Sequence, residues 1–305
     1  MKETQENNGY AVALGVFDGE HIGHKIVIGT MLLEKDLKKG IFTFKTETIP
    51  QKSNKPLEYI YKTEYKELLF SLLNIDKIYS ADYSEICDMD GDTFCKKILC
   101  EKFNAKKIFC GYDFRFGKGA AWGVKDLESF GEKYGFTVHP VNAVSSPDNP
   151  KKKMSSSDIR DFLKNGEIKK ANEYLGIDCE YAIYGIVENG KKIGRTIDFP
   201  TINQSFGKGQ LVPKFGVYLS KVYFDYKKYN EFKWGVTNIG VKPTVTDENI
   251  PLAETHILDF SGDLYGKKIK VCLEEFIRPE MKFNNIDELK KQIKADIKTA
   301  EKLII

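Results

Sequence analysis

Short apolar runs alternate with segments of helical periodicity over the first 140 residues. Buried strands are predicted at 10–14, 41–44, 77–80, 107–110 and 136–140. Helices are predicted between them at 22–38, 63–74, 92–103 and 124–134. Gly40 is expected to end the first helix and Thr63 to cap the second. This alternation predicts an α/β fold with a doubly wound parallel sheet, which binds ligands outside the carboxyl ends of its strands.

From about residue 180 the pattern changes to short strand-like runs with turn residues between them. The runs are YAIYGIVENG (181–190), GVYLSKVYF (216–224), KWGVTNIG (233–240), THILDF (255–260) and KKIKVCLEEF (267–276). They predict an antiparallel sheet or small β-barrel. A last helix is predicted at 286–303, with Asn285 and Glu288 as a cap pair and one apolar face that packs against the barrel.

The change of pattern divides the chain. Residues 145–153 read as an exposed loop, and two short helices are expected after it, at 156–164 and 167–175. We therefore expect a first domain over residues 1–155, bridging helices over 156–179 and a second domain over 180–305.

The amino-acid composition argues against nucleic acid and membranes as binding partners. The 47 basic residues nearly balance the 44 acidic ones, so the net charge of +3 gives no polybasic surface for nucleic acid. No signal peptide and no apolar run of about 18 residues is evident. The six cysteines form no C-x-x-C pair and are expected to be reduced thiols. The protein is expected to be cytoplasmic, with no membrane, nucleic-acid or obligate protein partner.

Two of the four histidines, His21 and His24, lie in GVFDGEHIGHK (15–25), directly after the first predicted strand. Such a pair can bind a metal, move a proton, bind phosphate or simply cap a helix. No cysteine or E-x-x-H motif nearby completes a zinc site. A strand, a glycine turn and a helix start together form an anion site, because free N–H groups and the helix dipole point outward. Histidines there can donate to phosphate oxygens.

H-x-G-H after a first strand resembles the signature of the nucleotidyltransferase superfamily, which has a Rossmann-like fold. That resemblance implies a second signature near the end of the domain, a serine-rich loop with a basic residue. Met154-Ser-Ser-Ser-Asp-Ile-Arg160 has this form. Serine hydroxyls at a helix start, with Arg160 one turn in, suit the β- and γ-phosphates of ATP.

A second candidate site lies in the predicted barrel. In Phe199-Pro-Thr-Ile-Asn203, Thr201 and Asn203 fall on one side of an extended segment and suit Mg²⁺. Glu254, at the start of an apolar strand, can act as general base toward a hydroxyl acceptor. A simple turn and a solvated strand end are the structural alternatives for these two features.

Over residues 10 to 300 the sequence resembles the family of prokaryotic bifunctional riboflavin kinase/FMN adenylyltransferases, or FAD synthetases. The resemblance rests on GVFDGEHIGHK, GYDFRFGKGAAWG, SSSDIR, GRTIDFPTIN, GVYLSKV, GVTNIGVKPT, ETHILDFSGDLYGKKI and EFIRPEMKF, in that order. It implies that the C-terminal barrel phosphorylates riboflavin with MgATP, and that the N-terminal Rossmann-like domain then transfers AMP from ATP to FMN. The implied cofactor is Mg²⁺, ATP is the co-substrate, and FMN and FAD are the products.

The resemblance also implies roles for single residues. His21 and His24 would stabilise the phosphates during adenylyl transfer, and Glu254 would take the proton from the ribityl 5′-hydroxyl. Thr201 and Asn203 would hold Mg²⁺–ATP. The other ATP-binding positions would be Gly15, Phe17, Asp18, Gly19, Gly23, Ser155, Ser156, Arg160, Gly194 and Thr196. The flavin-binding positions would be Phe44, Asp113, Phe114 and Arg278, although a structural ion pair is an equal reading of Arg278.

Four departures from the family pattern stand out. Thr43-Phe44 is followed by Lys45-Thr-Glu47, without the family's His-Pro, and Asp158 stands where arginine is common. In the kinase half, Asp198 replaces the usual glycine and Ile202 the usual alanine. The first departure motivates an alternative: a riboflavin kinase whose N-terminal domain is degenerate and only binds nucleotide. A non-enzymatic flavin sensor or RNA-binding regulator using Lys151–Lys153 is a third reading.

Overall fold

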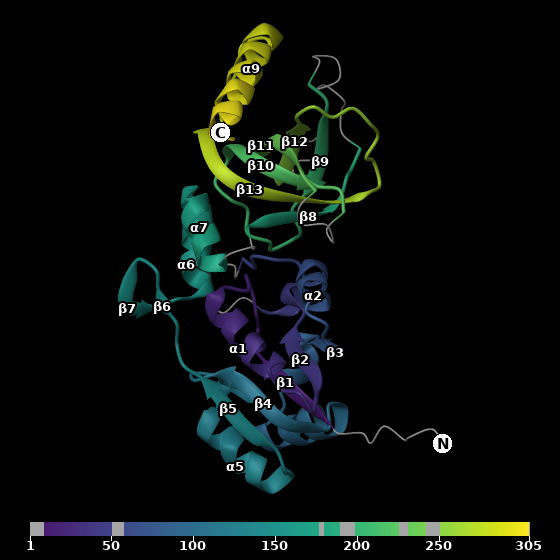
Figure 1. Ribbon diagram of the computed structural model, residues 1–305, viewed down its shortest axis with the longest axis vertical. Coiled ribbons are helices and arrows are strands. Elements are labelled where there is room, and N and C mark those ends of the chain that lie inside the picture. The colour runs from purple at the N-terminus through teal and green to yellow at the C-terminus, as the bar shows by residue number, and fades with distance from the viewer. Residues whose placement is uncertain are drawn as a thin grey trace. The chain divides into compact units, whose positions relative to one another are not determined.

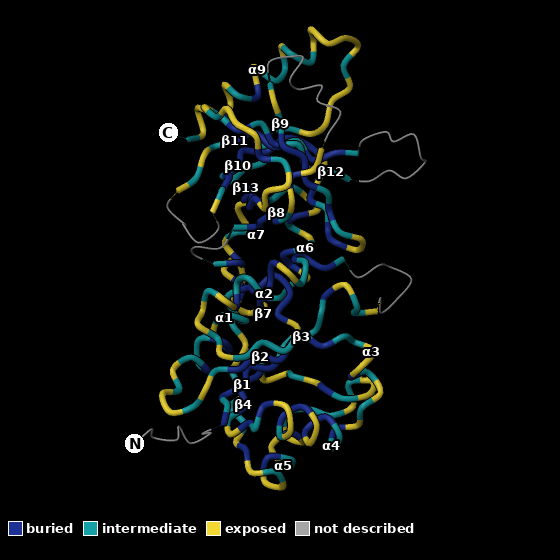
Figure 2. Tube along the Cα trace, turned by 90° about the vertical axis from the view of Figure 1, so that its right-hand side faces the viewer, coloured by how far each residue is buried: buried dark blue, intermediate teal, exposed yellow. Residues whose placement is uncertain are grey.

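The computed structural model describes residues 9–50, 58–176, 180–189, 199–225, 231–241 and 251–304. The chain divides into two compact units, Met1–Ser156 and Ser157–Ile305. Each unit has its own sheet and its own buried core (Figures 1 and 2).

The first unit is built on a five-stranded parallel sheet. Its strands are β1 (Tyr10–Leu14), β2 (Lys38–Phe44), β3 (Lys77–Ala81), β4 (Ala105–Gly111) and β5 (Thr137–Val141). They lie in the order β3-β2-β1-β4-β5, and every neighbouring pair is parallel. The predicted doubly wound sheet is confirmed. Because the order reverses beside β1, the loops after β1 and β4 flank the position where such sheets bind ligands.

Helices cover both faces of this sheet. They are α1 (Ile22–Leu32), α2 (Thr63–Ser71), α3 (Tyr83–Ile86), α4 (Gly91–Phe94) with a π-helical continuation (Cys95–Lys102), and α5 (Val124–Tyr134). Consecutive residues of β1 pack into two different cores. Val12 packs with Leu99 of the π-helical segment, whereas Ala13 packs with Met31 and Phe70. This alternation follows from the period of two along a strand.

Two expected helix ends are wrong. The first helix ends at Leu32, six residues before its predicted end, and Gly40 lies inside β2 rather than capping a helix. A Cβ at Gly40 would lie 2.9 Å from the ring of Phe103, so the glycine allows close packing on the strand. Thr63 is the first residue of α2 and not its cap. Its N–H donates instead to the Glu47 carboxylate at 2.8 Å.

The segment expected as a loop at 145–153 forms a hairpin. Its strands are β6 (Ser145–Ser146) and β7 (Asn149–Lys153). The last residue of β7, Lys153, forms an ion pair with Asp113 in the loop after β4, at 2.6 Å. The hairpin is therefore tied to the ligand-binding edge of the sheet.

In the second unit, helix α6 (Ser156–Asn165), whose first residue still belongs to the first unit, is followed by α7 (Ile168–Leu175); both match the prediction within one residue. Its strands are β8 (Ala182–Ile186), β9 (Thr201–Ser205), β10 (Gly216–Tyr223), β11 (Lys233–Val241), β12 (Pro251–Ile257) and β13 (Lys268–Pro279). They form one antiparallel sheet in the order β8-β13-β10-β11-β12-β9. The outer strands meet where Glu188 N–H donates to Asn203 O at 2.8 Å, which gives a nearly closed barrel.

The last helix, α9 (Ile286–Leu303), has the predicted bounds and packs on the barrel. Its Ala300 and Ile297 contact a cluster that contains Val217 and Val236. Asn285 caps the helix by accepting the Glu288 N–H at 2.9 Å. The predicted terminal helix, its cap residue and its apolar face are thus confirmed.

Candidate functional sites

The two predicted histidines lie at the junction of β1 and α1. We call residues 15–21 the histidine loop. The Nδ1 of His21 accepts the backbone N–H of His24 at 3.3 Å, which caps α1. The two imidazole rings stack with centroids 3.7 Å apart. Gly23 makes room for this stack, because a Cβ there would come within 3.0 Å of the His21 ring. The pair therefore caps the helix and also marks its N-terminus, where anions bind.

The histidine loop has an unusual backbone. Phe17, Gly19 and Glu20 have φ of 51°, 78° and 38°, in the left-handed region that non-glycine residues rarely adopt. Such strain persists only where surrounding contacts hold it. The Asp18 carboxylate supplies one contact, since it accepts the N–H of Ile60 at 2.9 Å. Side chains of Thr43 and Lys66 supply others at the Val16 carbonyl.

Ser156 connects the serine motif to the histidine loop. Its hydroxyl donates to the carbonyl oxygen of Asp18 at 2.8 Å, across 138 residues of sequence. The first unit therefore brings the two predicted motifs together. Ser155 lies beside Ser156, and Arg160 follows on α6 in the second unit.

The residues expected at the first flavin site lie at the carboxyl ends of β2 and β4. Phe44 ends β2 and packs on Phe42. Phe114 follows β4 and stacks on Phe116 with the ring planes 13° apart. Asp113, beside it, is paired with Lys153. Both segments lie at the sheet edge that binds ligands in this architecture.

In the barrel, three predicted residues share one face of neighbouring strands. Asn203 of β9 pairs in register with Glu254 of β12, and Thr201 pairs with His256. Paired positions in an antiparallel sheet point to the same side. The prediction that Thr201 and Asn203 lie on one side of an extended segment is confirmed. Glu254 lies in the middle of β12, so its placement at a strand start is wrong.

Asn203 carries the feature that best fits a cation. It is 5% exposed, and its Oδ1 has no hydrogen-bond partner within the described residues. A buried carbonyl oxygen without a donor is costly, and a hard cation such as Mg²⁺ takes oxygen ligands. Thr201 lines a cavity of about 470 Å³ close by. The other lining residues are Val187, Pro200, Ile202, Thr255, Ile257, Phe260, Ser261, Gly262, Asp263, Leu264 and Tyr265.

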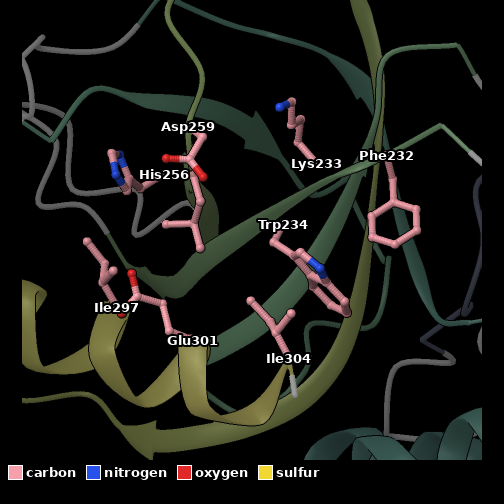
Figure 3. A pocket seen from close by; sticks show the side chains of 9 residues that line it. Phe232, Lys233, Trp234, His256, Asp259, Ile297, Glu301 and Ile304 are labelled. Carbon is pink, nitrogen blue, oxygen red and sulfur yellow. The ribbon is translucent and has the colours of Figure 1, made fainter.

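A second cavity, of about 560 Å³, lies between α9 and the strands β11 and β12 (Figure 3). Ile297 and Glu301 of α9 line one side, and Trp234 and His256 line the other. The Nδ1 of His256 lies 2.9 Å from the Pro200 carbonyl oxygen and donates to it, next to Thr201. This contact was not predicted.

The remaining predicted residues divide into two groups. Arg278 forms a two-pronged ion pair with Asp296 of α9, at 2.8 and 2.7 Å. Arg278 therefore forms the structural ion pair that was the alternative to a flavin contact. Gly194 and Thr196 lie outside the described residues.

Sequence reasoning missed a buried pair of ionisable residues beside the histidine loop. Lys66 is fully buried and Glu20 is 4% exposed. Burial lowers the pKa of Lys66 to about 8 and raises the pKa of Glu20 to about 8. The available signal was spacing: Lys66 lies four residues before the buried Phe70, on the core side of α2.

The described ranges contain no group of three histidine, cysteine or acidic side chains that could hold a metal ion. Nor do they contain a helix with the length and apolar character to span a membrane.

Comparison with known proteins assigns each half. A family model described as FAD synthetase matches residues 3–158, and one described as riboflavin kinase matches residues 177–304. The bifunctional riboflavin kinase/FMN adenylyltransferase of Bacillus subtilis is 35% identical over 97% of this chain and 92% of its own length. The chain belongs to this family.

Other family members show the same coverage. The Listeria monocytogenes protein is 31% identical over 93% of this chain and 89% of its own length, and the Escherichia coli K12 protein is 30% identical over 96% and 92%. A Streptococcus pneumoniae crystal structure, named a macrolide-efflux protein, superposes with a TM-score of 0.78. It is 26% identical and covers 96% of this chain and 94% of its own. The bifunctional riboflavin kinase/FMN adenylyltransferase family thus spans the whole chain.

Proposed function

We propose which residues carry the two reactions of this bifunctional riboflavin kinase and FMN adenylyltransferase. The domain over residues 180–305 phosphorylates riboflavin with ATP, giving FMN and ADP. The domain over residues 1–155 transfers AMP from a second ATP to FMN, giving FAD and pyrophosphate. Residues 156–179 join them. The order in which the two family models match the chain supports this division.

For adenylyl transfer, the observation that carries the proposal is the hydrogen bond from Ser156 to the Asp18 carbonyl. It holds the serine motif against the histidine loop, where the N-terminus of α1 offers free N–H groups to phosphates. His21 and His24 donate to phosphate oxygens as charge grows in the transition state. The backbone of Gly15, Phe17, Asp18, Gly19 and Gly23 shapes the cradle, and Ser155, Ser156 and Arg160 bind the distal phosphates.

For the kinase, the proposal rests on the register of β9 and β12, which places Glu254 beside Asn203. Glu254 accepts the proton of the ribityl 5′-hydroxyl as the oxygen attacks the γ-phosphate. Thr201 and Asn203 hold Mg²⁺, and the partnerless Oδ1 of Asn203 fits that assignment. When bound, Mg²⁺ neutralises charge on the ATP phosphates. The cavity at Thr201 is the proposed nucleotide site. Gly194 and Thr196 stay proposed ATP-binding residues outside the described ranges.

The proposed flavin contacts are Phe44, Asp113 and Phe114 in the first domain and Arg278 in the second. Phe44 and Phe114 offer aromatic faces to the isoalloxazine ring. Arg278 would need to exchange its Asp296 partner for the flavin, so it is the assignment that the contacts support least.

The alternative is a kinase whose N-terminal domain is degenerate. The segment after β2 that motivates it is well held: Lys45 pairs with Asp82 at 2.7 Å, and the Thr46 hydroxyl donates to the Tyr61 carbonyl at 3.0 Å. Although burial acts to raise it, hydrogen bonds from Thr63 hold the pKa of Glu47 below its ordinary value. Residues 45–47 thus pack onto the domain without the family's His-Pro, which supports the bifunctional proposal over the degenerate alternative.

The proposed partners are the small molecules riboflavin, FMN, FAD and ATP, and the proposed location is the cytoplasm. The five described cysteines are free thiols, as expected for a reducing compartment.

Chromatography of the flavins formed from riboflavin, ATP and Mg²⁺, with a parallel reaction started from FMN, tests this proposal. We expect FMN followed by FAD in the first reaction and FAD in the second. FMN alone from riboflavin, with no FAD from either start even after the flavin is reduced, would establish the degenerate alternative. No riboflavin-dependent use of ATP would contradict both and favour a non-enzymatic flavin sensor.

A further inference from the structure

Lys66 brings a charged group into the core of the first domain. Its side chain is fully buried, and its ammonium donates three hydrogen bonds. The acceptors are Val16 O at 3.0 Å, Thr43 Oγ1 at 3.1 Å and Phe44 O at 2.7 Å. All three are neutral oxygens, so these contacts use the full donor capacity of the ammonium without an ion pair.

The three acceptors come from two elements that the fold must hold together. Val16 belongs to the histidine loop, whereas Thr43 and Phe44 form the carboxyl end of β2. The Thr43 hydroxyl also donates to the Val16 carbonyl, at 2.8 Å. One side chain of α2 therefore joins the histidine loop to the end of β2, where Phe44 lies.

The histidine loop needs this support because its backbone is strained. Phe17 and Glu20 both have positive φ, and each lies within four residues of Val16. Contacts from the rest of the domain must hold such conformations. The Asp18 carboxylate anchors the middle of the loop and Ser156 anchors its Asp18 carbonyl. Lys66 anchors its first part, and it is the one anchor of these three that is a cation.

Several ionisable groups surround this anchor. Asp18, Glu20, Glu47 and Glu67 act on Lys66, and Lys66 and Lys25 act on Glu20. The Oε1 of Glu20 is buried and has no hydrogen-bond partner among the described residues. Since burial brings the pKa of both Lys66 and Glu20 to about 8, Lys66 is charged and Glu20 is a neutral acid at pH 7.

We propose that Lys66 is a positioning residue for adenylyl transfer: its ammonium fixes the Val16 carbonyl against the end of β2 and so holds the histidine loop in its productive shape. This inference rests on the proposed role of the histidine loop. Lys66 does not touch the reacting atoms. It acts through Val16 on His21 and His24, whose placement a small shift of the loop would disturb.

Replacement of Lys66 by Met tests the proposal, since Met keeps the length of the side chain and removes the three donors. We expect kcat for FAD formation from FMN to fall at least tenfold, with FMN formation from riboflavin unchanged. Thr43→Val removes one acceptor and the second bond to Val16, and a smaller loss in the same direction is expected. Lys125→Met, an exposed lysine of α5, is the matched control and retains both activities.

The pH dependence separates positioning from simple stability. Deprotonation of Lys66 removes a donor, so kcat for FAD formation should decline above about pH 8. A negative Glu20 keeps the proton on Lys66. In Glu20→Gln this negative charge is absent, so the decline, measured relative to each protein's own rate at pH 7, should begin at lower pH.

The outcomes distinguish the inference from the function on which it rests. If His24→Ala leaves FAD formation intact, the proposed role of the histidine loop is wrong. If His24→Ala abolishes it while folded Lys66→Met and Thr43→Val keep full rates, Lys66 has no positioning role. Should Lys66→Met fail to fold, Thr43→Val and the Glu20→Gln pH profile decide: full activity of the first with an unshifted profile of the second overturns the proposal.

Discussion

Glu254 carries the sharpest residue-level prediction in the kinase. Glu254→Gln keeps the shape of the side chain but removes the carboxylate that we propose as proton acceptor, at the position paired with Asn203. We expect the rate of FMN formation to fall about 10²–10⁴-fold, the usual contribution of a general base, with FAD formation from FMN unaffected. Initial rates of ADP release with riboflavin measure it. Glu173→Gln, on the exposed side of α7, is the control. A loss of less than about threefold would remove Glu254 as the base.

His24 carries the corresponding prediction for adenylyl transfer. His24→Ala leaves the strand and the turn before it in place but removes one of the two donors that we propose for the phosphates. We expect FAD formation to fall about 10²–10³-fold, as for other transition-state donors, with FMN formation unchanged. Pyrophosphate release from ATP and FMN measures it. His139→Gln changes the third histidine of this domain, which lies outside the histidine pair, and should keep activity; an equal loss there would point to general destabilisation.

Residue spacing predicted some of the local geometry. The structure brings Ser156 to the Asp18 carbonyl and puts Thr201 and Asn203 on one side of β9, whereas the catalytic and binding roles of these residues stay predictions. Lys66 could not be predicted with the same ease, because lysine normally lies at the surface and its acceptors lie 22 to 50 residues away. The ion-pair partner of Arg278 could not be predicted from the sequence either, because Asp296 lies on a different element.

At the scale of elements, the contact between α9 and β13 makes a stability prediction. Arg278 and Asp296 are both largely buried, with side chains 17% and 5% exposed. Asp296→Asn keeps the volume but leaves the guanidinium without its counter-charge. We expect a loss of about 1.5–3 kcal/mol in the free energy of unfolding of the second domain. Thermal unfolding with Asp287→Asn as the exposed control measures it. A change within about 0.5 kcal/mol would contradict the role of the pair.

Element positions were predicted more reliably than their ends. The period of the apolar residues predicted the observed bounds of α5 and α9, because the apolar face of each helix packs against the rest of its unit. The roles predicted for Gly40 and Thr63 as helix caps were wrong, because tertiary contacts override the local preference of each residue. Phe103 needs a glycine beside it on β2, and Glu47 takes the capping role from outside α2. Such contacts join distant segments and leave no local pattern.

For the whole molecule, the change from α/β alternation to short strands predicted two fold classes in one chain, and both are confirmed. Strand order was beyond prediction. In the first unit β4 pairs with β1, and in the second β13 lies between β8 and β10. Those pairings depend on crossovers and barrel closure, and they decide which loops meet. The β9–β12 pairing likewise brings Asn203 to Glu254, and a single long-range hydrogen bond joins Ser156 to Asp18.

We propose that each of the two reactions has its own site on its own domain. The most direct test is to measure the flavins formed from riboflavin and from FMN by Glu254→Gln, by His24→Ala and by the two variants mixed. We predict that Glu254→Gln converts FMN but not riboflavin, that His24→Ala converts riboflavin but stops at FMN, and that the mixture forms FAD from riboflavin. A folded single variant that loses both activities would contradict the two-site account.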